Sequence, residues 1–347
     1  MSPARCAAPV LSPPSLPAEA SLRVSLRARG CEESFSEMRT KRSCKSRLTQ
    51  AELRKRRPPT VQLPLTLKQA WSLTPNRMFP ILISVGGCAM SHIISGAEPF
   101  RFESPGALTA CLLLHGLTAT PQEMRRLGEF LRDAGVTAQA PLLAGHGTSV
   151  HDLRLCTWHD WYDSAFRSWQ ELQAHFPHVF AIGLSLGGAL ALYLATKVHV
   201  SGVVAMATPL VLDDRALWLA RLAKYITPFR RKGLSHLLDP IALAQRIAYD
   251  HTPTHSFEQT LLLCRALDDR LSQIQSPTLL IHSRLDRTVS PMDTQRIFDR
   301  LGTPNKRILW LENSGHILTE DYERQVIYDV ILRFVRDHTP TQQTKEP

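Results

Sequence analysis

The chain has 347 residues, 44% of them hydrophobic, and a formal net charge of +10. This length allows one large α/β domain or two small domains. No apolar stretch approaches the roughly 20 residues that a helix needs to cross a bilayer. A charge of this size is typical of proteins that bind nucleic acids or anionic membranes, so its position along the chain decides what it means.

The positive charge is confined to the N-terminal part of the chain. Residues 1–89 hold 15 Lys and Arg against 5 Glu, whereas residues 90–347 hold 26 basic and 26 acidic side chains. The larger part of the chain is therefore electrically balanced and has no bias toward polyanions. We expect no nucleic-acid partner.

The segment 1–89 is predicted to be a disordered basic extension. It contains 10 of the 24 prolines, and residues 54–59 are a run of four basic side chains followed by two prolines. Little of it has the periodicity of a packed core. It could be a flexible tail, a targeting region, or a stretch that is not natively translated because synthesis starts at Met78 or Met90. A start at Met78 would give residues 79–88 a faint similarity to a lipoprotein signal.

From residue 90 onward, apolar runs of strand length alternate with amphipathic runs of helix length. The expected strands are Thr109–Leu114, Val136–Ala140, Val179–Ile182, Val200–Ala207, Thr278–His282 and Arg307–Leu311. The expected helices are Pro121–Ala134, Trp158–Phe176, Gly187–Thr196, Pro291–Leu301 and Thr319–Asp337. This alternation predicts an α/β fold with a mostly parallel sheet covered by helices on both faces. Ligands of such sheets bind at the carboxyl ends of the strands.

The stretch 209–255 interrupts the alternation and is interpreted as a small inserted cap. It contains no strand-like run, and it is expected to be partly helical around Arg215–Tyr225. Four large apolar side chains recur there at helical spacing, and we interpret them as the core of the cap; a cap that meets lipid would have the same pattern. They are Trp218, Leu219, Leu222 and Tyr225.

Residues 183–188 read GLSLGG, between an apolar run and a run rich in Ala and Leu. A strand that turns into a helix within two residues forces the residue between them into a strained conformation, and side chains two positions away on either side would collide. Gly183 and Gly187 have no side chain to collide. The strain would lift the Ser185 hydroxyl clear of the sheet, which favours a nucleophile over an ordinary serine in a small-residue turn.

A serine nucleophile needs a base, and the base needs a carboxylate that orients it. Two loops after expected strands offer these groups, Asp286 after Thr278–His282 and His316 after Arg307–Leu311. The spacing of the loops fits strands that are neighbours in the sheet. Asp293 and Asp299 are rivals to Asp286, but they fall within the following helix, where they would cap it or face solvent.

Two backbone N–H groups are candidates for an oxyanion hole. The N–H of Leu186 lies at the start of the helix after Ser185, and that of Leu117 follows the His115–Gly116 pair after the first strand. A glycine there allows the backbone to pass close to Ser185. The alternative is a tight strand-to-helix turn that directs no amide toward the serine.

Three cysteines lie outside residues 1–89, namely Cys111, Cys156 and Cys264. They are widely spaced and fit no metal-ligand pattern. They are typical of buried thiols in a reducing compartment, so we expect a cytoplasmic protein. The chemistry of a serine, histidine and aspartate needs neither a metal nor an organic cofactor, and none is expected.

From Ile94 to Phe334 the chain resembles the bacterial monoacylglycerol lipases, in the esterase branch of the α/β-hydrolase fold. The stretches that carry the resemblance are residues 95–100 (SGAEPF), 114–118 (LHGLT), 145–148 (GHGT), 158–161 (WHDW), 183–188 (GLSLGG) and 252–254 (TPT). The resemblance implies an α/β-hydrolase fold with a small cap, a triad of Ser185, Asp286 and His316, and oxyanion amides at Leu117 and Leu186. Residues 218–238 match the family poorly, so no glycerol-recognising residue is carried over.

Three functions are compatible with these features. The first is hydrolysis of monoacylglycerols to fatty acid and glycerol through an acyl-enzyme on Ser185. The second is a general carboxylesterase or thioesterase, and the third is a non-catalytic ligand-binding hydrolase fold, against which the intact triad argues. The expected partner is a small ester or lipid, with at most transient contact between the cap and a lipid interface. The sequence leaves the oligomeric state open.

Overall fold

The computed structural model describes residues 92–233 and 237–340. The predictions for residues 1–89, including the starts at Met78 and Met90, lie outside the described residues. A seven-stranded sheet forms the centre of the described domain, in the order β1-β3-β2-β4-β5-β8-β9. Neighbouring strands are parallel except β1, which pairs antiparallel with β3. The predicted α/β class with a mostly parallel sheet is confirmed.

The strands of the main sheet are short and, except for β1 and β9, almost entirely buried, as expected for a sheet with helices on both faces. They are β1 (Phe100–Phe102), β2 (Thr109–Leu114), β3 (Thr137–Ala140), β4 (His178–Leu184), β5 (Gly202–Met206), β8 (Thr278–Ser283) and β9 (Lys306–Leu311). The helices are α1 (Gln122–Asp133), α2 (Val150–Leu155), α3 (Trp158–Gln173), α4 (Leu186–Ala195), α5 (Asp214–Ile226), α6 (Pro240–Gln245), α7 (Thr254–Asp268), α8 (Pro291–Arg300) and α9 (Arg324–Asp337), with a short 3₁₀ turn η2 (Leu271–Gln273).

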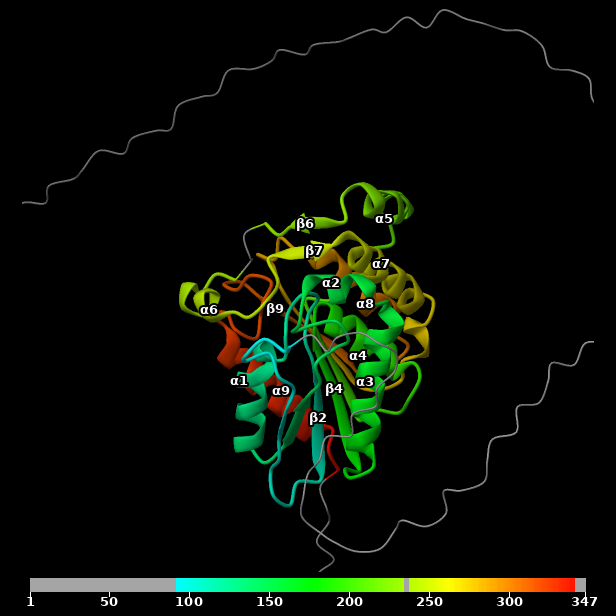
Figure 1. Ribbon diagram of the computed structural model, residues 1–347. Coiled ribbons are helices and arrows are strands. Elements are labelled where there is room, and N and C mark those ends of the chain that lie inside the picture. The colour runs from blue at the N-terminus through cyan, green and yellow to red at the C-terminus, as the bar shows by residue number, and fades with distance from the viewer. Residues whose placement is uncertain (1–91, 234–236, 341–347) are drawn as a thin grey trace, which may run out of the picture. The chain divides into compact units, whose positions relative to one another are not determined.

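The two faces of the sheet carry separate hydrophobic cores. Figure 1 shows α1 and α9 on one side of the sheet and α3 and α4 on the other. In β2, Leu112 and Leu114 belong to the core with α3 and α4, whereas Cys111 and Leu113 belong to the core with α1 and α9. Successive side chains of a strand point to opposite faces, so a wholly apolar strand supplies both cores. This is why the strands read as continuous apolar runs.

The last helix begins later than its periodicity predicts. It starts at Arg324 instead of Thr319, because the residues before it form a turn held by a carboxylate. Asp321 accepts hydrogen bonds from the backbone N–H groups of Gly315, Leu238 and Asp239, at 2.7, 3.0 and 3.0 Å. The buried Asp321 therefore ties this turn to the loop before His316 and to the segment before α6.

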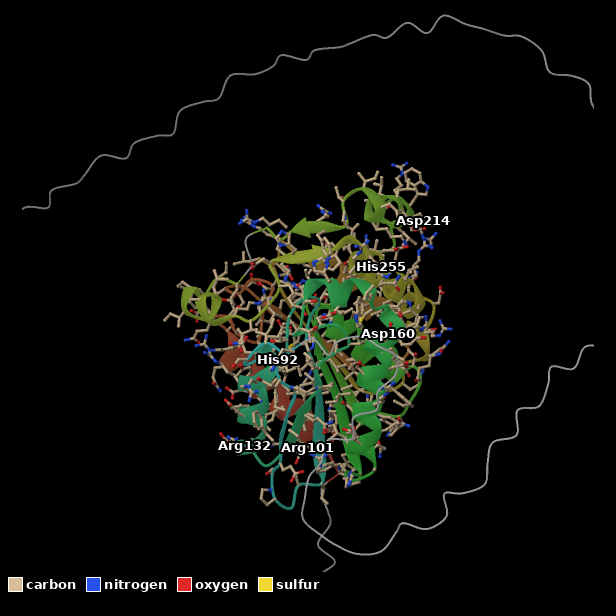
Figure 2. All side chains as sticks on the ribbon, viewed as in Figure 1. His92, Arg101, Arg132, Asp160, Asp214 and His255 are labelled. Atoms are coloured by element: carbon tan, nitrogen blue, oxygen red, sulfur yellow. The ribbon has the colours of Figure 1, made fainter. Side chains whose placement is uncertain are left out.

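The stretch 209–255 departs from expectation in two ways. It contains a two-stranded antiparallel sheet, in which β6 (Phe229–Arg231) pairs with β7 (His251–Pro253), so the expectation that it holds no strand is wrong. Strands of three residues are too short for a periodic pattern to reveal them. Figure 2 shows Asp214 of α5 and His255 of α7 at the end of the domain opposite Arg101 and Arg132.

The interpretation of the apolar side chains on α5 as a core is also wrong. Leu217 and Ala220 are buried on this helix, where they pack against Leu261 of α7. Trp218 and Tyr225 are 60% and 80% exposed, and Leu219 and Leu222 are exposed as well. The wide apolar face of α5 therefore points outward, and only the narrow side with Leu217 and Ala220 packs against α7.

Candidate active site

Ser185 occupies the sharp turn between β4 and α4, and its backbone is strained. It has φ of 54° and ψ of −115°, and its N–H donates to the carbonyl of Met206 at 2.8 Å. A positive φ is uncommon for a residue with a side chain and persists only where the surroundings enforce it. Pairing with the end of β5 supplies that constraint, so the predicted strand–turn–helix around Ser185 is present.

The two glycines around Ser185 are required by close backbone contacts. A Cβ on Gly183 would collide with the backbone of Gly187, and a Cβ on Gly187 would collide with the carbonyl of Leu114 at the end of β2. Backbone atoms cannot rotate away as a side chain can, so either methyl group would displace the turn. The GLSLGG sequence therefore reflects steric exclusion on both sides of the serine.

The loop after β2 passes directly beside the serine. The register of β2 and β4 pairs Leu114 with Gly183, and a Cβ on Gly116 would lie 3.7 Å from the Cβ of Ser185. In the described part of the chain, neither the N–H of Leu117 nor that of Leu186 donates to another residue. Both residues line the cavity that holds Ser185, where two unengaged N–H donors can stabilise a developing oxyanion.

Both backbone groups of Gly116 are fixed by buried side chains. Glu123 of α1, only 2% exposed, accepts the N–H of Gly116 through Oε1 at 2.5 Å. The N–H of Leu143 donates to Nε2 of His115 at 3.2 Å, so Nδ1 of that ring carries the proton and donates to the Gly116 carbonyl at 3.0 Å. Burial lowers the pKa of His115, in keeping with this neutral tautomer. Glu123 was not predicted, because an acidic residue in the first turn of a helix is ordinary.

Asp286 and His316 meet as the loop positions predicted. Nδ1 of His316 lies 2.7 Å from Oδ2 of Asp286, and both side chains are almost fully buried. The two loops follow β8 and β9, which pair in parallel, so the prediction that these strands are neighbours is confirmed. A carboxylate only accepts hydrogen bonds, so Nδ1 carries the proton and Nε2 of His316 is left as the acceptor.

His282, the penultimate residue of β8, also contacts the carboxylate and was not predicted. Its Nε2 lies 3.1 Å from Oδ2 of Asp286, and its Nδ1 lies 2.5 Å from the hydroxyl of Thr294 on α8. Since Nε2 donates to the carboxylate, Nδ1 accepts the hydroxyl proton of Thr294. The one signal in the sequence is a histidine directly after the apolar run Leu279–Ile281, four residues before the aspartate.

The other carboxylate oxygen of Asp286 is held by the loop itself. Oδ1 accepts the N–H groups of Thr288 and Val289, at 2.7 and 3.0 Å. Burial alone would raise the pKa of Asp286, but the hydrogen bonds from His282, His316 and the Val289 N–H hold that pKa well below its usual range. Asp286 is therefore ionised throughout the neutral range and keeps Nδ1 of His316 protonated.

The rival aspartates are engaged elsewhere. Asp293 accepts the N–H of Leu210 at 3.0 Å and pairs with Arg296 at 3.1 Å, while Asp299 bonds to Gln295 within α8. Neither has a hydrogen bond to His316 within residues 92–233 and 237–340. The geometry favours Asp286 over both.

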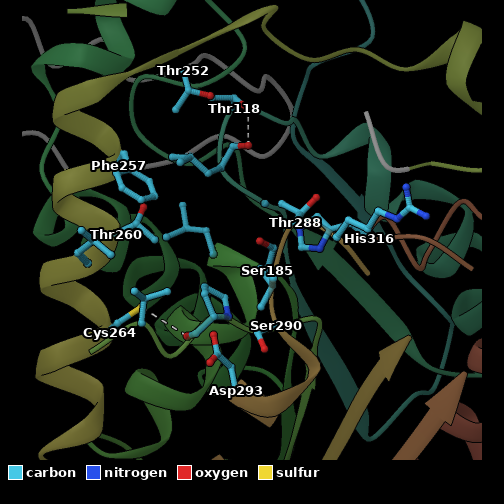
Figure 3. A pocket seen from close by; sticks show the side chains of 18 of the residues that line it. Thr118, Ser185, Thr252, Phe257, Thr260, Cys264, Thr288, Ser290, Asp293 and His316 are labelled. Atoms are coloured by element: carbon cyan, nitrogen blue, oxygen red, sulfur yellow. Dashed lines mark hydrogen bonds between the residues drawn. The ribbon is translucent and has the colours of Figure 1, made fainter. Parts of the chain in front are cut away.

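Ser185 and His316 border one cavity of about 990 Å³. Figure 3 shows them next to each other, with Phe257, Thr260 and Cys264 of α7 on the opposite wall. Leu117 and Leu186 line the same cavity, and Asp286 lies behind His316. Four of the five predicted site residues thus border one space, and the fifth binds one of them.

In residues 92–233 and 237–340, no group of three or more His, Cys, Asp or Glu side chains could hold a metal ion. No helix in those ranges is long and apolar enough to cross a membrane.

This geometry agrees with the protein family that the chain matches. The family described as serine aminopeptidase, S33, matches residues 106–323, a span that includes the Ser185 turn, Asp286 and His316. The chain belongs to this family. It is a serine hydrolase with the α/β-hydrolase fold, and its family members use a serine nucleophile on the turn after a central strand.

Within this family, the chain is similar to lipases and carboxylesterases. A thermostable monoacylglycerol lipase of a Bacillus species is 34% identical over 250 residues, which cover 71% of this hydrolase and 97% of the relative. A carboxylesterase of Bacillus subtilis is 27% identical over 241 residues, covering 69% and 96%. The solved structure of a metagenome-derived lipolytic enzyme superposes with a TM-score of 0.67 at 29% identity, covering 71% of the hydrolase and all of that chain.

Proposed function

We propose that the hydrolase cleaves monoacylglycerols to fatty acid and glycerol through an acyl-enzyme on Ser185. The observation that carries the proposal is the single cavity in which Ser185 and His316 face an apolar wall from α7. An acyl chain gains free energy by leaving water for such a wall. The 34% identity to a monoacylglycerol lipase supports the same substrate class.

In the proposed mechanism, Nε2 of His316 accepts the hydroxyl proton of Ser185 as the serine oxygen attacks the ester carbonyl. The N–H groups of Leu117 and Leu186 stabilise the oxyanion of the tetrahedral intermediate, each worth about 3 kcal/mol in comparable enzymes. The imidazolium then protonates the glycerol oxygen, and the C–O bond to glycerol breaks. A water molecule, deprotonated by His316, attacks the acyl-enzyme and regenerates Ser185. Asp286 keeps the imidazole in the required tautomer and stabilises its charge.

Hydrolysis of simple short esters is the second candidate. It is supported by the 27% identity to a carboxylesterase over nearly the whole of that relative. The two functions share one chemistry and differ in how much of the cavity the acyl chain fills. Acyl-length dependence therefore separates them.

We also propose that the exposed face of α5 makes transient contact with lipid interfaces. Its exposed apolar side chains are Trp218, Leu219, Leu222, Tyr225 and Ile226. Aromatic and aliphatic groups on one face of a helix insert readily at the boundary of a lipid aggregate. A reducing, cytoplasmic compartment is proposed as well, supported by the free thiols of Cys111, Cys156 and Cys264.

A substrate panel tests the proposed function. Monoacylglycerols of graded chain length, a two-carbon ester, a diacylglycerol and leucine p-nitroanilide would be compared by kcat/KM. The proposal expects the highest values for medium or long monoacylglycerols. Highest values for the two-carbon ester would favour the carboxylesterase, and cleavage of the anilide alone would indicate a peptidase.

Ser185→Ala provides the background for the panel. It should lower turnover of every ester to below about a thousandth of the wild-type value, because the nucleophile is lost. Ser290→Ala is a matched control, since Ser290 lines the same cavity but caps α8 by accepting the N–H of Met292. A serine-directed phosphonate should label the wild type and the Ser290 variant, but not the Ser185 variant. Labelling of the Ser185 variant would assign the nucleophile elsewhere.

A further inference from the structure

The cavity has an apolar side and a basic side. Phe257, Leu261 and Cys264 of α7 belong to its apolar wall, together with residues after β5. Lys232 and Arg246, from the two segments that flank α6, line it as well. An acyl chain bound to Ser185 occupies the apolar wall, so the basic side is left for the alcohol portion of the ester.

The acidic side chains of the lining already have partners. Glu123 binds the N–H of Gly116 and pairs with Arg246 at 3.5 Å, and Asp293 binds a backbone N–H and pairs with Arg296. Asp213 accepts the N–H of Arg215 and caps α5. The lining therefore has an excess of positive charge that its own carboxylates do not neutralise.

Lys232 and Arg287 are the basic side chains of the lining that form no ion pair within the described residues, and Lys232 is the less exposed of the two. It is half-buried, its backbone N–H donates to the carbonyl of Asp250 at 2.9 Å, and its ammonium forms no ion pair with a carboxylate of the described residues. Burial and the nearby charge of Arg246 lower the pKa of Lys232 to about 7, although the charges of Glu123 and Asp250 oppose that shift. A half-buried ammonium beside a guanidinium is unfavourable, and an anion placed between them would offset that cost.

The pair Glu123–Arg246 gives this side of the cavity a fixed geometry. Glu123 holds the Gly116 N–H with one oxygen and lies 3.5 Å from Arg246 with the other, so the guanidinium is oriented by the same residue that fixes the loop of Leu117. An anion bound beside Lys232 and Arg246 would then lie in a constant position relative to the oxyanion donors. The hydroxyls of glycerol can accept hydrogen bonds from these side chains, but they carry no negative charge that would neutralise them.

We propose that Lys232, assisted by the charge of Arg246, forms an alcohol-side subsite that binds an anionic group, phosphate or carboxylate, on the alcohol portion of a monoacyl ester. The inference rests on the proposed ester hydrolysis at Ser185 and narrows its substrate class. Monoacylglycerol phosphates and acyl esters of glyceric acid have this chemistry. Both carry one acyl chain and a negative charge on the side of the leaving group.

The test compares three octanoyl esters at pH 7, fixed ionic strength and concentrations below micelle formation. They are octanoylglycerol, octanoylglycerol phosphate and octanoylglyceric acid, and the readout is the ratio of kcat/KM between each anionic ester and the neutral one. The wild type should prefer an anionic ester by about tenfold or more, the range of one hydrogen-bonded charge pair. The larger of the two ratios identifies phosphate or carboxylate as the preferred anion.

Three variants separate charge recognition from structure. Lys232→Met should lower the ratio about tenfold, whereas Lys232→Arg, which keeps the charge, should hold it within about threefold. Arg230→Met removes the same charge from the exposed strand β6, outside the cavity lining, and should leave the ratio unchanged. Equal losses on neutral and anionic esters in Lys232→Met would overturn the proposal, as would a wild type that prefers the neutral ester.

A different result would show that the proposed function itself is wrong. If wild-type enzyme cleaved none of the octanoyl esters faster than Ser185→Ala, ester hydrolysis itself would be wrong. If it cleaved them with a ratio that Lys232→Met does not change, only the anionic subsite would be wrong.

Discussion

Replacement of His282 by leucine tests whether the second histidine on Asp286 positions the catalytic pair. The variant removes one of the four hydrogen bonds that the Asp286 carboxylate accepts, the one from Nε2 at 3.1 Å. It also leaves the hydroxyl of Thr294 without its ring partner. A hydrogen bond to a charged group is worth about 1.5–3 kcal/mol, so the free energy of unfolding at pH 7 should fall by about that amount.

The same loss predicts how far the pKa of Asp286 moves. One pKa unit corresponds to 1.36 kcal/mol, so the pKa of Asp286 should rise by about 1 to 2 units. It starts well below its usual range, so the carboxylate stays ionised at pH 7 in the variant. The fall in activity therefore reflects a less well oriented His316 and should reach up to about a hundredfold in kcat/KM.

The pH dependence of stability has a defined sign. Because the folded state holds the pKa of Asp286 low, its stabilising contribution is complete above the unfolded value of about 3.9 and is lost as the pH falls toward the folded value. Wild type and His282→Leu share the unfolded value, so the difference between them shrinks only as the pH falls to their folded pKa values; urea unfolding should show the full difference at pH 7 and a smaller one at about pH 2.5. A difference that does not change with pH would assign the loss to packing.

His282→Gln is the matched variant, because the amide nitrogen of glutamine can take the place of Nε2 and donate to Asp286. It should recover a large part of the kcat/KM lost in His282→Leu, measured with a soluble p-nitrophenyl ester. If His282→Leu kept kcat/KM within twofold of wild type, or if glutamine were as poor as leucine, the positioning role would be refuted.

Three further predictions address other parts of the chain. Glu320 is 5% exposed and 3.5 Å from Arg126, and burial raises its pKa to about 7, so its ionisation between pH 4.5 and 7 lowers the stability of the fold. In urea unfolding at pH 8, Glu320→Gln should therefore be more stable than wild type by at most about 3 kcal/mol. If this difference were no larger at pH 8 than at pH 5, the prediction would be wrong. Trp218→Ala and Tyr225→Ala should lower the turnover of micellar monoacylglycerol several-fold. Turnover of a soluble short ester should stay within about twofold of wild type, because neither side chain lines the cavity. Equal losses on both substrates would indicate damage to the fold. A chain that starts at Met90 should match the full-length turnover, and loss of activity on truncation would show that residues 1–89 contribute.

The sharp turn at Ser185 could be predicted because its constraints are local in sequence. A side chain on Gly183 would meet backbone atoms four and five residues away, and one on Gly187 would meet the end of β2, so only glycine fits at either position. Asp286 and His316 could be predicted from a weaker rule, that catalytic groups follow strands of a parallel sheet. The two side chains meet because β8 and β9 are neighbours in the sheet, and their catalytic roles stay a prediction.

The supporting residues could not be predicted in the same way. Glu123 acts on Gly116 from the first turn of α1, and His282 acts on Asp286 from inside β8, and neither residue type identifies its partner by itself. Their roles exist only through contacts that the fold creates. α7 escaped prediction for a related reason, since its buried residues include the polar Gln259 and Glu258 and its apolar stripe is irregular.

The segment 246–249 and the loop of Leu117 are physically coupled, so we expect chemistry and substrate choice to depend on each other in this enzyme. The N–H of Tyr249 donates to the carbonyl of Thr118 at 2.9 Å, and Ile247 bonds through its carbonyl to Thr120 and through its N–H to Gln122. The stretch that carries Arg246 into the cavity therefore also holds the loop of Leu117 in place. A substitution at Ile247 or Tyr249 should change kcat together with KM, because it shifts an oxyanion donor as well as a wall of the cavity.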